Sequence, residues 1–138
     1  MTPPARRRTS PLTSLAAVRD MIKFRLTRKP YDGRVNGEPE LIEIGPDQVD
    51  QHVSDGWTLL DVRTDGEWAD GRIEGATHLP LDQLIAREDE VPDRVICVCA
   101  VGARSAQAAA YLQRRGRQAI NLAGGVYGWA DAGRPLVR

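Results

Sequence analysis

Cys99 stands at a position where a chain can make a thiol reactive. It ends the run RVICVC, residues 94–99, the most β-branched and apolar stretch of the 138-residue sequence, which predicts a buried strand. A helix is predicted over residues 105–115, where alanines are frequent and Gly116 gives a stop signal. A short loop between a strand end and a helix N-terminus can turn several backbone N–H groups inward and hold an anion. We therefore expect a lowered pKa for the Cys99 thiol.

The connecting loop, residues 100–104, has the composition that such an anion site needs. Gly102 gives the backbone freedom to curl, the two alanines leave the amides accessible, and Arg104 adds a permanent positive charge. This pattern suits a thiolate that takes up and holds an anionic sulfur or oxyanion group. Taken singly, Cys99 fits a buried apolar side chain and Arg104 a surface charge. The combined spacing C-x-x-G-x-R-S favours the functional interpretation.

The second cysteine, Cys97, is interpreted as core packing, because it lies inside the predicted strand and has no loop of its own. Two cysteines separated by one residue cannot staple a small secreted domain, so that class of protein is excluded. Free thiols are expected, and with them a reducing compartment, the cytoplasm.

The elements that must position Cys99 alternate between strand and helix. Helices are predicted at 47–54, 105–115 and 126–132, with shorter helical turns at 67–69 and 81–86. Strands are predicted at 41–44, 57–62, 76–79, 94–99 and 118–122. Continuous apolar strands alternating with helices predict an α/β fold, a parallel sheet covered on both faces. Ligands of such sheets bind beyond the C-terminal strand ends, which points to the ends of 57–62 and 94–99.

The zero net charge of the chain is the sum of two unlike parts. Residues 1–31 contain eight basic residues and one acidic residue, so the remainder is acidic by the same margin. Residues 1–39 are interpreted as a basic N-terminal extension, flexible or with one amphipathic helix over 12–28, and residues 40–138 as the domain. A transit peptide and a contact of the basic segment with an anionic membrane surface stay open as alternatives. No apolar run is long enough to span a membrane.

Three segments resemble the single-domain rhodanese family, in the order that the family has them. They are LLDVRTDGEWADGRIEGATHLPL (59–81), VICVCAVGARSAQAAAYLQRRG (95–116) and NLAGGVYGWADAGRPLV (121–137). The resemblance covers residues 40–138 and implies a five-stranded, mainly parallel sheet with helices on both faces. It also implies that Cys99 is the catalytic residue and carries a persulfide. The loop that holds the transferred sulfur would consist of Ala100, Val101, Gly102, Ala103 and Arg104.

The resemblance assigns supporting roles to further residues. Asp61 and Arg63, in the family's D-V-R motif, are expected to form an ion pair that fixes the neighbouring loop, and Ser105 is grouped with them. Where the family usually shows Gly-His-Ile, this chain has Gly-Arg-Ile at residues 71–73, which leaves the role of the missing histidine open. His78 is interpreted as a satisfied edge residue rather than a base.

The C-terminal motif and the tryptophans are assigned to packing. Gly124 and Gly125 permit a tight turn, and Trp129 completes the family's Gly-Gly…Trp signature. Trp129 and Trp68 are both expected in the core rather than in contact with substrate.

The function expected is that of a sulfurtransferase, moving a sulfane sulfur from thiosulfate or a persulfide to a thiol or cyanide. Because the loop side chains other than Arg104 are uncharged, a persulfide donor is favoured over thiosulfate. The partners expected are small donors and thiol acceptors, with a protein persulfide as a further candidate. No nucleic acid, metal or organic cofactor is expected.

Two alternatives stay open. One is a rhodanese-like binding or redox-sensing module with little turnover. The other is a phosphatase or arsenate-type reductase, but four residues separate Cys99 from Arg104, one fewer than in related cell-cycle phosphatases, and this tighter loop suits a single sulfur better than phosphate.

Overall fold

Five strands form one parallel sheet in the computed structural model, which describes residues 34–35 and 38–138. The strands are β3 (Glu43–Ile44), β4 (Thr58–Asp61), β5 (Thr77–His78), β6 (Arg94–Val98) and β7 (Gln118–Leu122). Their order in the sheet is β3-β7-β6-β4-β5, so the strand that leads to Cys99 lies at the centre. The predicted five-stranded, mainly parallel sheet is confirmed.

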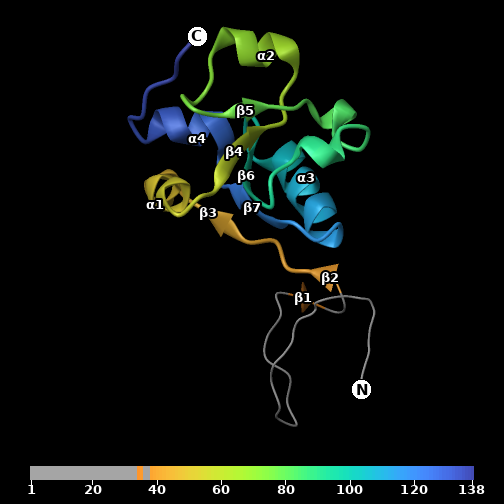
Figure 1. Ribbon diagram of the computed structural model, residues 1–138. Coiled ribbons are helices and arrows are strands. Elements are labelled where there is room, and N and C mark those ends of the chain that lie inside the picture. Colours follow the sequence, from red (N-terminus) through yellow and green to blue (C-terminus); the bar gives the residue numbers. More distant parts are fainter. Residues whose placement is uncertain (1–33, 36–37) are drawn as a thin grey trace, which may run out of the picture. The chain divides into compact units, whose positions relative to one another are not determined.

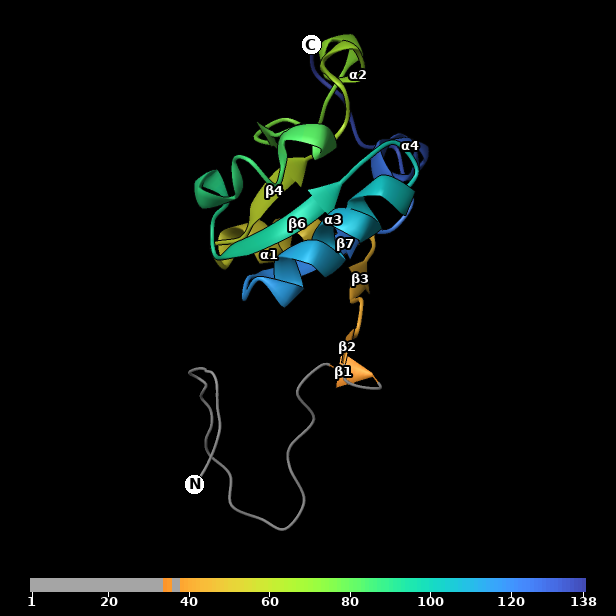
Figure 2. The same ribbon diagram turned by 90° about the vertical axis from the view of Figure 1, so that its right-hand side faces the viewer.

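Helices cover both faces of this sheet, as predicted. The α-helices are α1 (Val49–Ser54), α2 (Asp65–Asp70), α3 (Ala103–Arg114) and α4 (Gly125–Asp131), with 3₁₀ turns η1 (Pro46–Gln48), η2 (Leu81–Gln83) and η3 (Glu88–Glu90). Helix α3 packs on one face, and α1 and α4 pack on the other. Figure 2 shows α3 running in front of β6 and β7.

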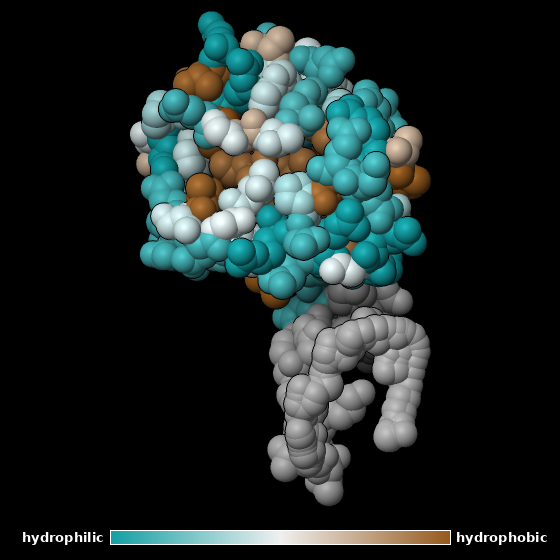
Figure 3. Space-filling model, in the orientation of Figure 1, coloured by the Kyte–Doolittle hydropathy of each residue, from teal (hydrophilic) through white to brown (hydrophobic). Residues whose placement is uncertain are grey.

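The side chains on the two faces of β6 belong to two separate hydrophobic clusters of the core. Val95 and Cys97 pack with residues of α3, whereas Ile96 and Val98 pack with residues of α1 and α4. All four side chains are buried. Burial on both faces is the reason for the unbroken apolar run in the sequence. Outside this core, Figure 3 shows a largely hydrophilic face with a few apolar residues in a hollow.

Helix α3 begins at Ala103, two residues earlier than the sequence predicts. The cause is Gly102, which takes a left-handed backbone (φ 107°) and serves as the N-cap. Its carbonyl accepts the N–H of Ala106 at 3.1 Å, so the chain turns from strand to helix within a few residues. Arg104 therefore lies in the first turn of α3 rather than in the loop. The strand β6 ends at Val98, and Cys99 is the next residue.

Ahead of the domain boundary expected at residue 40, β1 (Arg34–Val35) and β2 (Glu38–Pro39) form an antiparallel pair that the sequence did not predict. The helix predicted over 12–28 lies outside the described residues, as do residues 1–33 of the predicted extension. Within the part of the chain that the structure describes, no helix is long and apolar enough to cross a membrane.

The start of α4 packs directly under the loop that follows Cys99. The N–H groups of Val126 and Tyr127 donate to the carbonyls of Cys99 and Ala100 at 2.8 and 3.1 Å. A Cβ atom on Gly125, which has a φ of +59°, would lie 2.3 Å from the Cys99 carbonyl oxygen. Only glycine allows this close approach.

Substitution of this glycine is expected to move the loop as well as strain the backbone. Gly125→Ala should lower the free energy of unfolding by more than Gly116→Ala, measured by urea denaturation. Gly116 also has a positive φ (+93°), but nothing lies within 4 Å of its Cβ position, so it isolates the cost of the backbone alone, roughly 1–2 kcal/mol. Equal losses for the two variants would contradict the close packing of α4 against the loop.

Candidate active site

Cys99 lies at the C-terminal end of β6, with its sulfur turned toward the first turn of α3. The residue is buried. The Gly102 N–H donates to Sγ at 3.0 Å, and the Ser105 hydroxyl oxygen lies 3.3 Å from Sγ. The left-handed turn at Gly102 thus directs a backbone amide at the sulfur, as expected from the sequence.

The surroundings of Cys99 favour its thiolate. Burial raises the pKa of the thiol, but the Ser105 hydroxyl and the amides of Ser105, Gly102 and Val101 act in the opposite direction by hydrogen bonding. Their combined effect is larger, so the pKa of Cys99 lies below that of an ordinary thiol.

Cys97 has the opposite environment. It is buried in the cluster between the sheet and α3. Burial, with a smaller contribution from the neighbouring Cys99 charge, raises the pKa of the Cys97 thiol to about 12. Both cysteines are free thiols. The interpretation of Cys97 as core packing is confirmed.

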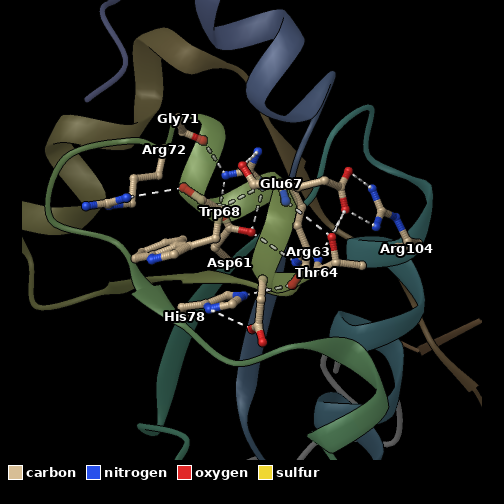
Figure 4. Close-up of polar contacts among 10 residues, drawn as sticks. Asp61, Arg63, Thr64, Glu67, Trp68, Gly71, Arg72, His78 and Arg104 are labelled. Carbon is tan, nitrogen blue, oxygen red and sulfur yellow. Dashed lines mark hydrogen bonds and ion pairs between the residues drawn. The ribbon is translucent and has the colours of Figure 1, made fainter. Parts of the chain in front are cut away.

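Arg104 is not the free cation that the sequence suggested. Its Nη1 and Nη2 donate to the two carboxylate oxygens of Glu67, each at 2.8 Å (Figure 4). Such a two-point pair neutralises the guanidinium and fixes its direction. The hydrogen bond from Arg104 is also the main reason why the pKa of Glu67 falls to about 2; burial opposes this effect, and hydrogen bonds from Thr64 add to it.

Glu67 was not singled out from the sequence, although a signal for its position was there. Thr64 and Glu67 form a capping box at the start of α2, the T-x-x-E pattern of a helix N-terminus. That pattern would have placed the helix at Asp65–Asp70 instead of a short turn at 67–69. It does not show the pairing with Arg104, which is 37 residues away along the chain.

Asp61 and Arg63 form the expected ion pair behind this site. Nη2 of Arg63 lies 2.8 Å from Oδ2 of Asp61, and both side chains are buried. The same guanidinium donates to the carbonyls of Glu67, within α2, and of Gly71, directly after it, so it fixes this helix against the end of β4. Neither residue hydrogen-bonds Cys99 in the described part of the chain. Their assigned supporting role stays a prediction.

The two tryptophans differ from each other. Trp129 is buried among the residues that pack on α4, as predicted. The prediction that Trp68 belongs to the core is wrong: it is half-buried and stacks on the His78 ring with centroids 4.6 Å apart. Arg72 covers its other side at 4.8 Å, so the arginine that replaces the family's histidine packs on this ring. His78 Nε2 donates to the Arg63 carbonyl at 2.8 Å, as a satisfied edge residue would.

A cleft of about 500 Å³ opens next to Arg104. Its lining comes from the loops after β4 and β5 and from the start of α3, and consists of Val62, Thr64, Asp65, Pro80, Leu81, Asp82, Gln83 and Arg104. Two carboxylates therefore face the cleft, and its one arginine is already paired. No cluster of His, Cys, Asp or Glu within residues 34–35 and 38–138 could hold a metal ion.

The predicted residues are thus brought together in part. The sulfur of Cys99 is in contact with Gly102 and Ser105, and the amide of Val101 also interacts with it. Arg104 points to Glu67, toward the cleft. Asn121 was not predicted, yet it hydrogen-bonds Ser105 from the neighbouring strand β7. This arrangement can stabilise a thiolate, and a negative charge carried one atom further out, in a buried setting where hydrogen bonds are strong.

Comparison with known proteins shows which family has this domain and this fold. Residues 45–132 match the model of the rhodanese-like domain. A sulfurtransferase of Allochromatium vinosum is 41% identical over 100 residues, which cover 69% of this chain and 94% of that protein. A rhodanese-related protein from Thermoplasma volcanium superposes with a TM-score of 0.65 at 26% identity, over 70% of this chain and 97% of the other. A rhodanese-like domain protein from Staphylococcus aureus superposes with a TM-score of 0.62 at 30% sequence identity. The superposition covers 71% of this chain and 100% of that protein.

The contrast between the two thiols gives a direct prediction. Iodoacetamide should modify Cys99 at a pH below the usual thiol range, because only the thiolate reacts, and should leave Cys97 unmodified in the folded protein. Mass spectrometry of the wild type and of Cys97→Ser and Cys99→Ser at a series of pH values measures this. In denaturant the pH midpoints for alkylation of the two cysteines should converge. Alkylation of Cys97 before Cys99 in the folded protein would contradict the assignment.

Proposed function

The chain belongs to the rhodanese-like domain family, and from this premise we propose that it is a sulfurtransferase that carries a sulfane sulfur as a persulfide on Cys99. The observation that carries the proposal is the pairing of the Cys99 sulfur with the Gly102 amide and the Ser105 hydroxyl. A thiol in the core that served only for packing would have no reason to lie against these two polar groups. Cys97, which is buried as well, has its pKa raised.

In the first half-reaction the Cys99 thiolate attacks the outer sulfur of the donor. A bond forms between the two sulfurs, the S–S or S–SO₃ bond of the donor breaks, and a thiolate or sulfite leaves with the electron pair. In the second half-reaction an acceptor thiolate attacks the outer sulfur of the Cys99 persulfide. The acceptor then carries the persulfide, and the Cys99 thiolate is regenerated. No proton transfer to a side chain is needed at either step.

The loop stabilises the anion in both states. The amides of Val101, Gly102 and Ser105 and the positive end of helix α3 favour a negative charge on Cys99 or on the sulfur attached to it. These donors are fixed by the backbone, so they need not reorganise during transfer. We assign residues 100–103 to binding the transferred sulfur and Arg104 to the edge of the site.

The charges beside the site support a persulfide donor more than thiosulfate. Arg104 is neutralised by Glu67, and Asp65 and Asp82 add two negative charges to the cleft next to it. A dianion such as thiosulfate is disfavoured there. We propose a small-molecule or protein persulfide as donor and a thiol as acceptor, a pairing that suits a reducing compartment such as the cytoplasm.

Sulfur loading tests the proposal. Incubated with a persulfide donor, the protein should gain the mass of one sulfur atom, and a thiol should remove it. Cys99→Ser should lose this gain and Cys97→Ser should keep it, because only Cys99 has the anion-stabilising loop. Absence of a sulfur adduct on the wild type with both persulfide and thiosulfate would overturn the proposal. An adduct without turnover would instead favour a binding or redox-sensing module.

Donor preference tests the role of the Glu67–Arg104 pair. Glu67→Gln should raise the rate with thiosulfate relative to a persulfide donor, because it frees the guanidinium charge while the glutamine can still serve the capping box. The gain should shrink at high salt. Glu90→Gln is the matched control, since Glu90 pairs with Arg87 at 2.8 Å on the exposed surface. An unchanged donor ratio in Glu67→Gln would contradict the electrostatic argument.

A further inference from the structure

A chain of hydrogen bonds runs from the surface to the reactive sulfur. Glu43 Oε2 accepts from Asn121 Nδ2 at 2.9 Å, Asn121 Oδ1 accepts from the Ser105 hydroxyl at 2.5 Å, and the Ser105 oxygen lies 3.3 Å from Cys99 Sγ. Asn121 and Ser105 are both fully buried, so water cannot replace their partners. Glu43 is exposed at the edge strand β3.

The direction of the Asn121 amide is fixed by its acceptors. Its two N–H bonds are used by the Glu43 carboxylate at 2.9 Å and by the Gly102 carbonyl at 3.1 Å. Neither acceptor could pair with the amide oxygen. Oδ1 therefore faces Ser105 and, being an acceptor only, must receive the hydroxyl proton.

Ser105 has one proton and competing acceptors for it. The oxygen of Asn121 lies at 2.5 Å, whereas Cys99 Sγ and the Gly102 carbonyl both lie at 3.3 Å. While the hydroxyl donates to Asn121, the Ser105 oxygen can only accept from Cys99, which suits the neutral thiol. For the hydroxyl to donate to a thiolate, its bond to Asn121 must break.

We propose that Asn121 is a positioning residue that holds the Ser105 proton away from Cys99 and so limits how readily the thiolate forms. In the resting thiol the S–H donates to Ser105, and Ser105 donates to Asn121. On ionisation the hydroxyl turns to the sulfur, and the Asn121 oxygen loses its donor. The catalytic significance rests on the proposed persulfide chemistry, but the effect on the thiol does not.

The other charged and titratable groups near Cys99 take no part in this chain of hydrogen bonds. From its own segment these are Cys97 and Arg104, and Glu67 of α2 neutralises Arg104. Asp61, at the end of β4, is paired with Arg63. None of them hydrogen-bonds Ser105 or Asn121 among the contacts of the described residues.

The test is the pH dependence of Cys99 alkylation by iodoacetamide without any sulfur donor, in a Cys97→Ser background. Asn121→Leu should move the midpoint to lower pH by about one unit, because a hydrogen bond to a charged group has an effect of this order. In Ser105→Ala, where there is no hydroxyl proton to hold, the added Asn121→Leu should produce no shift. The same shift in both backgrounds, no shift, or an upward shift would overturn the proposal.

A milder variant guards against loss of folding. Glu43→Ala removes the exposed anchor, which lets the amide turn its N–H toward Ser105 and frees the hydroxyl for the sulfur. A smaller shift of the same sign is expected, with Glu90→Ala as a control that leaves the midpoint unchanged. A Glu43→Ala midpoint equal to that of the control would count against the proposal. Because no sulfur transfer is measured, failure here is separate from failure of the sulfur-loading experiment.

Discussion

The turn between β6 and α3 is the constraint on which the rest of the structure depends. The left-handed backbone at Gly102 brings its N–H to the Cys99 sulfur and starts the helix in the same step. Neighbouring elements hold this turn from several sides. Helix α4 donates to its carbonyls from below, and Asn121 of β7 binds the Gly102 carbonyl. The chemistry of one sulfur is therefore supported by backbone geometry rather than by a set of charged side chains.

The charged side chains around the turn are almost all committed to one another. Arg63 is paired with Asp61 and with the carbonyls of Glu67 and Gly71, and Arg104 is paired with Glu67. Buried charges need such partners, because an unpaired one is costly to remove from water. The result is a site whose local potential comes mainly from amides and the α3 dipole. Such a site favours a single extra negative charge over a multiply charged ligand.

The sequence was most informative where one segment contains both the pattern that predicts the secondary structure and the residues proposed to react. The run from β6 into α3 contains Cys99, its loop and Ser105 within seven residues, so the strand, the turn and the proposed nucleophile could be predicted together. Glu67 and Asn121 come from other elements, and nothing local marks them as neighbours of residues 37 and 16 positions away. For the same reason Arg104 was expected to be free. Helix α3 begins earlier than predicted because the left-handed Gly102 already serves as its N-cap.

The two cysteines tie the stability of the fold to pH in opposite directions. A thiol with a lower pKa in the folded chain stabilises the fold above its unfolded pKa, and this contribution is lost as the pH falls through the folded value. Cys99 behaves in this way. Cys97, with its pKa raised to about 12, stabilises the fold below its unfolded pKa and loses that contribution as the pH rises toward 12. In alkaline solution Cys99 therefore offsets part of the destabilisation caused by Cys97, so the thiol with the lower pKa contributes to the resistance of the fold against alkali.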